Sequence, residues 1–100
     1  MTVCTAIHEI RSEAGLSLED AADRLGVTPD VLADVESSRI APPVGMIDAV
    51  AATFGEDPVV RSTRASDVYA AANPKLRAGL EKMLTTWERN AAAAHAAEPA

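Results

Sequence analysis

The fold of this chain is decided by residues 7–55, IHEIRSEAGLSLEDAADRLGVTPDVLADVESSRIAPPVGMIDAVAATFG. Near the middle of this stretch, Ser17 is a residue type that favours the N-cap of a helix, and the acids after it suit the first helical turn. Gly26 can take the positive φ of a tight turn. Thr28 followed by Pro29 predicts a second cap, with proline at the first helical position. These signals predict two short helices joined by a tight turn.

Further helices are predicted on both sides of this pair. Gly15 can end a first helix, and the consecutive prolines within residues 37–43 predict a loop. A fourth helix then runs to Gly55. The apolar spacing gives the expected inward positions: Ile7, Ile10, Ala14, Ala21, Ala22, Leu25, Leu32, Val35, Met46, Ile47, Val50, Ala51 and Phe54.

Beyond this region the sequence predicts a connector and a last helix. Asn73 followed by Pro74 is a strong start signal for that helix. The connector is expected to be less regular, with a short helix near residues 66–72, and the alanine-rich residues 91–100 are expected to fray. The expected organisation is residues 1–57 as a domain, residues 58–73 as the connector and residues 74–97 as a C-terminal helical arm.

Composition narrows the class of protein. A chain of 100 residues with 48% hydrophobic and 3% aromatic residues can build one small core made largely of alanine. Cys4 is the single cysteine, and His8 and His95 are far apart in the sequence, so no metal site is predicted. Nothing resembles a catalytic set or a cofactor-binding motif. We therefore expect no enzyme activity, no cofactor, no membrane segment and a cytoplasmic location.

The charge distribution opposes one obvious class of partner. The formal net charge is −6 at pH 7, and residues 1–57 carry three arginines against eleven acidic residues. Residues 58–100 are mildly basic, with six basic against four acidic residues. Proteins gain much of their affinity for DNA by neutralising phosphates with lysine and arginine. The N-terminal part is therefore electrostatically poor for DNA binding.

Anchors in register nonetheless indicate a known family. They are Arg11, Gly15-Leu16-Ser17, Ala22, Leu25-Gly26-Val27, Leu32, Val35-Glu36, and Pro42 leading into residues 47–54. On these residues, about half of the chain resembles the Cro/C1-type helix-turn-helix family, the lambda-repressor-like or XRE regulators. The resemblance implies an all-α domain of four to five helices with a C-terminal helical arm. It also implies a salt bridge between Arg11 and Glu36.

The resemblance further implies a DNA-contacting surface, where this chain departs from the family. Bases are usually recognised by donors such as arginine or glutamine, which Pro29, Asp30 and Asp34 do not supply. Leu18 stands where the family often has a glutamine that contacts phosphate, and Ser38 where it often has glycine. The residues expected at the DNA surface are Ser17, Thr28, Pro29, Asp30, Ala33, Asp34 and Arg39.

Several residues have more than one interpretation. Asp30 and Asp34 are solvated helix acids, an acidic surface for a basic partner, or acceptors for cytosine N4. Leu18 is either exposed or folded onto the first helix. Ile40 is either a protein-contact residue or a loop residue that rests on the fourth helix, and the second interpretation is favoured. Residues 61–64, which hold two arginines, form either a plain connector or an arm that contacts the DNA backbone.

An apolar stripe on the last helix also has two interpretations. It can pack back on the small N-terminal domain, or it can pair with its copy in a second chain. The second interpretation is favoured because symmetric dimers are the commonest soluble oligomers and tryptophan often anchors interfaces. The predicted dimerisation residues are Leu76, Leu80, Met83, Leu84 and Trp87.

Two functions follow as hypotheses. The first is a small transcriptional regulator that binds DNA as a homodimer. The alternative is a degenerate helix-turn-helix that binds a basic protein partner, a regulator or part of the transcription machinery, through its acidic third helix. Family resemblance favours the first, and the residues on the third helix favour the second.

Overall fold

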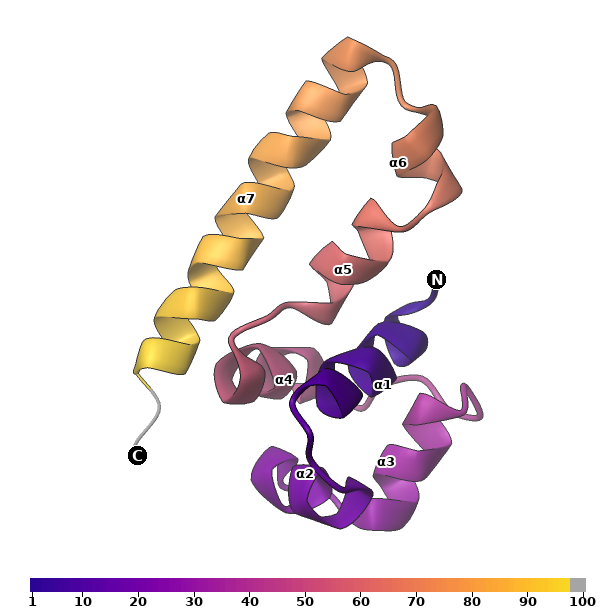
Figure 1. The fold of residues 1–100 in the computed structure, drawn as a ribbon, viewed down its shortest axis with the longest axis vertical. Helices are drawn as coiled ribbons and strands as arrows, with labels where there is room; N and C mark the ends of the chain where they lie inside the picture. The colour runs from indigo at the N-terminus through magenta and orange to yellow at the C-terminus, as the bar shows by residue number, and fades with distance from the viewer. Residues whose placement is uncertain (98–100) are drawn as a thin grey trace.

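The computed structural model describes residues 1–97, which contain seven helices and no strand (Figure 1). The expected all-α fold is confirmed. The expected domain of four to five helices with a C-terminal helical arm is confirmed, and the short helix expected near residues 66–72 is present at residues 67–71; the additional helix at residues 58–64 replaces the irregular start expected for the connector. The helices are α1 (Val3–Glu13), α2 (Leu18–Leu25), α3 (Pro29–Glu36), α4 (Met46–Phe54), α5 (Pro58–Arg64), α6 (Asp67–Ala71) and α7 (Pro74–Ala96).

Local capping chemistry explains where the helices begin. The side chain of Ser17 accepts a hydrogen bond from the backbone N–H of Asp20 at 3.1 Å, and Thr28 accepts one from Val31 at 3.2 Å. Asn73 does the same at the start of α7. Each bond satisfies one of the backbone donors that a helix N-terminus leaves free. These predicted helix starts are confirmed.

The core lies among the first four helices. Ile7, Ile10, Leu32, Val35 and Val50 are all buried there, as their spacing predicted. One expected inward position is wrong. Ala14 is exposed because α1 ends at the residue before it, and Ala6 is buried on the same helix instead.

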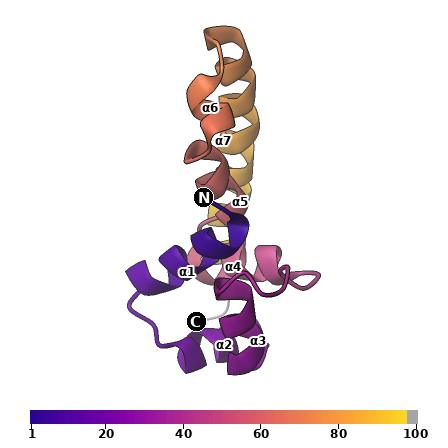
Figure 2. The ribbon, with the colours of Figure 1, turned by 90° about the vertical axis from the view of Figure 1, so that its right-hand side faces the viewer.

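The molecule is elongated, with extents of 42 × 31 × 24 Å. Helices α1 to α4 form one end, and α6 with the first half of α7 forms an arm at the other (Figures 1 and 2). Helix α5 packs against α1, while α7 turns back along α5 and reaches α4. The arm and the helix-turn-helix end therefore point away from each other.

The C-terminal part of α7 does not fray as expected. It stays helical to Ala96 because Ala91 is buried and His95 is tied to α4. The Nδ1 atom of His95 lies 2.8 Å from the carbonyl oxygen of Ala52, to which it donates a hydrogen bond. Residues 98–100 of the segment expected to fray lie outside the described residues.

The apolar stripe of α7 is divided between two surroundings. Leu84 is completely buried within the chain, so its assignment to a dimer interface is wrong for this fold. Leu76 and Met83 are 51% and 39% exposed, and Leu80 and Trp87 are half-buried. The middle of the apolar stripe packs on the rest of the chain. The first residues of α7 extend beyond α4 and α5.

Candidate nucleic-acid interface

Helices α2 and α3 form the end of the molecule opposite the arm (Figure 1). Gly26, with φ of 73°, closes α2 and turns the chain into α3. Thr28, Pro29 and Asp30 at the start of α3 are exposed, and Asp34 is half-buried one turn further on. Ala33 is also half-buried, and Ser17 is exposed at the start of α2. The residues predicted to contact DNA are therefore all at least partly accessible.

The end of α3 places Arg39 at this surface. The backbone N–H of Arg39 donates to the Asp34 carbonyl at 2.8 Å, and that of Ser38 donates to the Val35 carbonyl at 3.0 Å. This is the Schellman arrangement, whose αL position is usually a glycine. Ser38 occupies it with φ of 63°, a conformation that strains a residue with a Cβ. The Arg39 side chain is 77% exposed, and its Nη1 lies 3.8 Å from Asp34 Oδ1.

The ion pair implied by the family resemblance is present between α1 and α3. Arg11 donates from Nε to Glu36 Oε2 at 2.7 Å and from Nη2 to Glu36 Oε1 at 2.8 Å. Its Nη1 donates to the Leu16 carbonyl at 2.9 Å, and His8 Nδ1 lies 2.8 Å from Glu36 Oε1. Arg11 is therefore occupied within the fold and does not contribute to a DNA surface.

Burial and hydrogen bonding act in opposite directions on Glu36. Burial favours the neutral acid, but the hydrogen bonds from Arg11 and His8 outweigh it and lower the pKa of Glu36 below its ordinary value. The hydrogen bonds with Glu36 raise the pKa of Arg11 against the effect of burial. The pair is therefore fully ionised near neutral pH.

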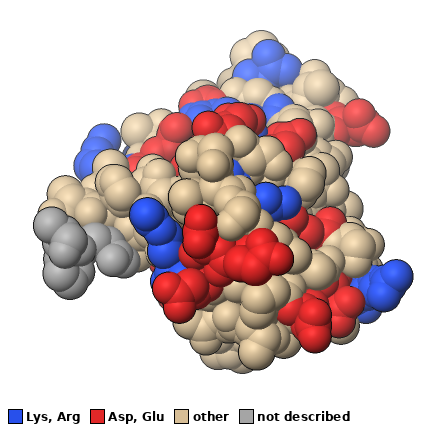
Figure 3. Space-filling model, turned by 60° about the horizontal axis from the view of Figure 1, so that its bottom comes forward, with Lys and Arg blue, Asp and Glu red and all other residues tan. Residues whose placement is uncertain are grey.

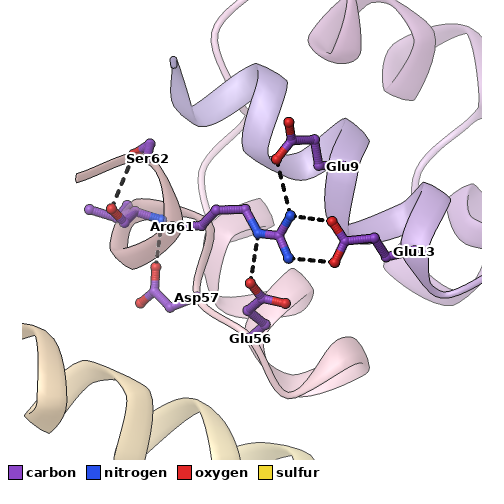
Figure 4. Close-up of polar contacts among 7 residues, drawn as sticks. Glu9, Glu13, Glu56, Asp57, Arg61 and Ser62 are labelled. Atoms are coloured by element: carbon purple, nitrogen blue, oxygen red, sulfur yellow. Dashed lines mark hydrogen bonds and ion pairs between the residues drawn. The ribbon is translucent and has the colours of Figure 1, made fainter. Parts of the chain in front are cut away.

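A second cluster fixes α5 to α1 through Arg61 (Figure 4). The Arg61 guanidinium donates to Glu13 at 2.5 and 2.7 Å, to Glu56 at 2.7 Å and to Glu9 at 3.0 Å. The hydrogen bonds with Glu13 and then Glu56 raise the pKa of Arg61. Since four hydrogen bonds to carboxylates engage the Arg61 guanidinium within the fold, the structure favours the interpretation of residues 61–64 as a plain connector.

Arg64 forms a similar cluster between α5 and α7. It donates to Glu88 at 2.7 Å and to Glu81 at 3.0 and 3.2 Å, and the Tyr69 hydroxyl also donates to Glu81. The hydrogen bond from Arg64 lowers the pKa of both glutamates. Sequence reasoning missed both clusters because their partners lie 17 to 52 residues from the arginines, or five residues away across a turn.

The resulting surface charge at the α2–α3 end is mostly negative. Within residues 1–57, Arg24 forms no ion pair with any described residue, and Arg39 forms only the long contact with Asp34. Figure 3 brings this end forward and shows more acidic than basic surface on it. The electrostatic conflict that the sequence predicted at this surface therefore persists in three dimensions.

Two apolar residues near this end are also placed by the structure. Leu18 is half-buried and packs against the core, so it is not a fully exposed contact. Ile40 is exposed in the loop after α3, and the expectation that it rests on α4 is wrong. Its backbone carbonyl lies 3.8 Å from Sγ of Cys4 on α1, within reach of a weak hydrogen bond from the thiol.

Neither a metal site nor a membrane span emerges from the part of the chain that the structure describes. Its histidine, cysteine and acidic residues form no group of three that could hold a metal ion. None of its helices combines the length and the apolar composition needed to cross a bilayer.

The chain belongs to the family described as "Helix-turn-helix domain", whose pattern matches residues 5–63. The match runs from α1 into α5, so it extends past the expected domain end at residue 57. Membership confirms the resemblance on which the fold was predicted and agrees with the expectation that the chain is not an enzyme.

One curated relative is also similar in sequence. The chain is 33% identical over 55 residues to the HTH-type transcriptional regulator DdrOP3 of Deinococcus deserti. The aligned part is 55% of this chain and 43% of that protein, so the chain spans less than half of the relative's length. No solved structure matches the chain.

Proposed function

We propose that this chain is a transcriptional regulator that binds DNA through α2 and α3 and acts as a homodimer. The observation that carries the proposal is a complete helix-turn-helix in which the outward residues of α3 are accessible at one end of the molecule. The relative whose name describes a transcriptional regulator supports the same class. The proposal also places the protein in the cytoplasm.

The DNA contacts would differ from those usual for such domains. Arg39 and Arg24 are the side chains at this end that can reach phosphates as free cations. Ser17 and Thr28 stand at helix N-termini, where backbone N–H groups favour phosphate. Asp30 and Asp34 can accept from cytosine N4 but donate to no base. With so few cations, binding should be weak and only moderately dependent on salt.

The dimer would use the part of α7 that extends beyond α4 and α5. Leu76, Leu80 and Met83 lie at four- and three-residue steps along this part of α7. They line a shallow groove with a volume of about 570 Å³. Gly79 lies on the same surface and allows a second helix to approach closely. A second copy that covered this surface would be related by a twofold axis, which suits two half-sites on DNA.

A protein partner is the second candidate, and the arrangement of the charges favours it. Arg11, Arg61 and Arg64 are consumed by ion pairs within the fold, which leaves an acidic α2–α3 end. Such a surface repels phosphate and attracts a basic protein. In this case α3 would contact a basic regulator or a basic part of the transcription machinery.

Titration of a fluorescently labelled random-sequence duplex at increasing salt separates the two candidates. If the protein binds DNA, the association constant of the wild type falls steadily with salt. The logarithm of this constant plotted against the logarithm of the salt concentration has a slope of about −2 if two cations contact phosphates. Absence of binding at the lowest salt, together with its appearance in Asp30→Arg/Asp34→Arg, would contradict the regulator proposal and favour a protein partner. Asp67→Arg reverses an acid on α6 and should leave the wild-type result unchanged.

Sedimentation equilibrium tests the dimer separately. The wild type should have twice the monomer mass at micromolar concentration, and Leu76→Glu/Met83→Glu should be monomeric with unchanged helix content. Thr85→Glu adds a charge at an exposed position on the same helix and should stay dimeric. A monomeric wild type would contradict this part of the proposal without affecting the part on DNA binding.

A further inference from the structure

A pocket of about 400 Å³ lies where α7, α4 and the start of α5 meet, at the opposite end of α7 from the proposed dimer surface. Trp87 forms part of its wall. Leu84 and Ala91, on the same face of α7, are buried, whereas Trp87 is only half-buried. The small side chains of Ala51 and Ala94 line the same hollow as Trp87.

The polar groups of this pocket are acidic or neutral. Asp48 of α4, Asp57 at the start of α5 and Asn90 of α7 line it, and none of its lining residues is basic. Asp57 is held in place because its Oδ1 accepts a hydrogen bond from the Val59 backbone N–H at 2.8 Å (Figure 4). The Asp48 side chain forms no ion pair or hydrogen bond with any residue in the range 1–97.

This combination of an aromatic wall, two carboxylates and an apolar floor has a definite preference for ligands. The face of an indole attracts cations, and tetraalkylammonium groups in particular bind to aromatic walls. The carboxylates repel anions, and the absence of a three-residue acid or histidine cluster in the described part of the chain argues against a metal ion. Its volume is within the range of small-molecule sites.

We propose that this pocket binds a small organic cation of the alkylammonium class, with the charged head between Trp87, Asp48 and Asp57. The alkyl part would lie against the alanine side chains of α4 and α7. This inference goes beyond the proposed DNA binding and does not depend on it. Since α4 belongs to the helix-turn-helix domain and α7 continues into the arm, a bound cation would connect the two parts.

Choline is a suitable probe, and 3,3-dimethyl-1-butanol is its neutral counterpart of nearly the same shape. Trp87 is the single tryptophan of the chain, so one indole N–H signal in a ¹⁵N–¹H spectrum reports on the pocket directly. The titration is made with the full chain at constant ionic strength. We expect choline to shift this signal in a saturable way at millimolar concentration, and the neutral alcohol to bind at least about fivefold more weakly.

Two variants and one control complete the test. Asp48→Asn should weaken choline binding about fivefold, because it removes a carboxylate that has no other partner. Ala94→Leu should abolish binding by filling the hollow, and Asp67→Asn, on α6, should behave as the wild type. Circular dichroism checks that each variant is folded. The proposal is overturned if choline gives no saturable shift, if the alcohol binds equally well, or if Asp48→Asn binds as tightly as the wild type.

Discussion

The ion pair between Arg11 and Glu36 offers a quantitative test of how α3 is held. Glu36 is 7% exposed and receives three hydrogen bonds, two from Arg11 and one from His8, while Arg11 is 16% exposed. We consider Glu36→Leu, Arg11→Met and the double variant. Each single substitution leaves one charge largely buried without its partner, whereas the double variant replaces the pair with two apolar side chains.

The expected magnitudes follow from burial. Removal of one partner of a buried pair costs about 3–5 kcal/mol. Glu36→Leu should lie at the lower end, about 3 kcal/mol, because Arg11 keeps its bond to the Leu16 carbonyl and some contact with water. Arg11→Met should cost about 2 kcal/mol because His8 still supports the carboxylate. The double variant should cost about 2 kcal/mol, which gives a coupling energy of about 3 kcal/mol between the two positions.

Urea denaturation followed by circular dichroism at pH 7 measures these free energies of unfolding. The slope of the free energy against urea should be the same for all four proteins, which shows that the comparison is valid. Asp23→Asn changes an exposed acid of α2 and serves as a control with an effect within about 0.5 kcal/mol. A coupling energy below about 0.5 kcal/mol would refute the claim that this pair acts as one unit.

Three further predictions concern the stability of the fold. Ser38→Gly should raise the free energy of unfolding by about 0.5 kcal/mol, seen as a higher melting temperature, since glycine takes the positive φ without strain; a lower melting temperature would contradict this. Leu84→Ala should cost about 3 kcal/mol in urea denaturation, equally at low and high protein concentration, because Leu84 is buried within one chain; a cost that depends on concentration would instead indicate a dimer contact. Stability should also fall in acid. The pKa of Glu36 in the folded protein is lower than its ordinary value of 4.5. Ionised Glu36 therefore stabilises the fold fully above pH 4.5, and this stabilisation is lost as the pH falls through the folded pKa. Melting temperatures that stay constant from pH 7 to pH 2 would contradict this prediction.

Most of the N-terminal fold could be predicted from local signals and family resemblance. The caps at Ser17 and Thr28 and the αL turn at Gly26 are short-range features that a sequence displays directly. The Arg11–Glu36 pair, in contrast, is not visible in the spacing of residues and came only from the resemblance.

The part beyond residue 57 was predicted less well because its structure depends on distant partners. Arg61 and Arg64 look like free surface cations in the sequence, yet residues far along the chain bind both. The periodicity of α7 gives an apolar stripe but not its partner, so it could not show that Leu84 is buried while Leu76 is exposed. The pocket beside Trp87 likewise arises from how α4, α5 and α7 meet.

The acidity of α3 was predicted correctly, but its functional meaning depends on what binds there. Asp30 and Asp34 are accessible, and no described basic residue approaches either more closely than the 3.8 Å contact from Arg39. Titration with a DNA duplex separates a role as cytosine acceptors from a role as an acidic surface for a basic protein.

The most direct test of the proposal that the α2–α3 end binds DNA is a ¹⁵N–¹H titration of the protein with a short random-sequence duplex at low salt. Non-specific complexes of this kind have dissociation constants of about 10⁻⁴–10⁻⁶ M, which suits the method. The proposal predicts progressive shifts of the backbone amides of Ser17, Thr28, residues 30–34 and Arg39, while α7 stays unchanged. Shifts confined to other helices, or none at all, would contradict it.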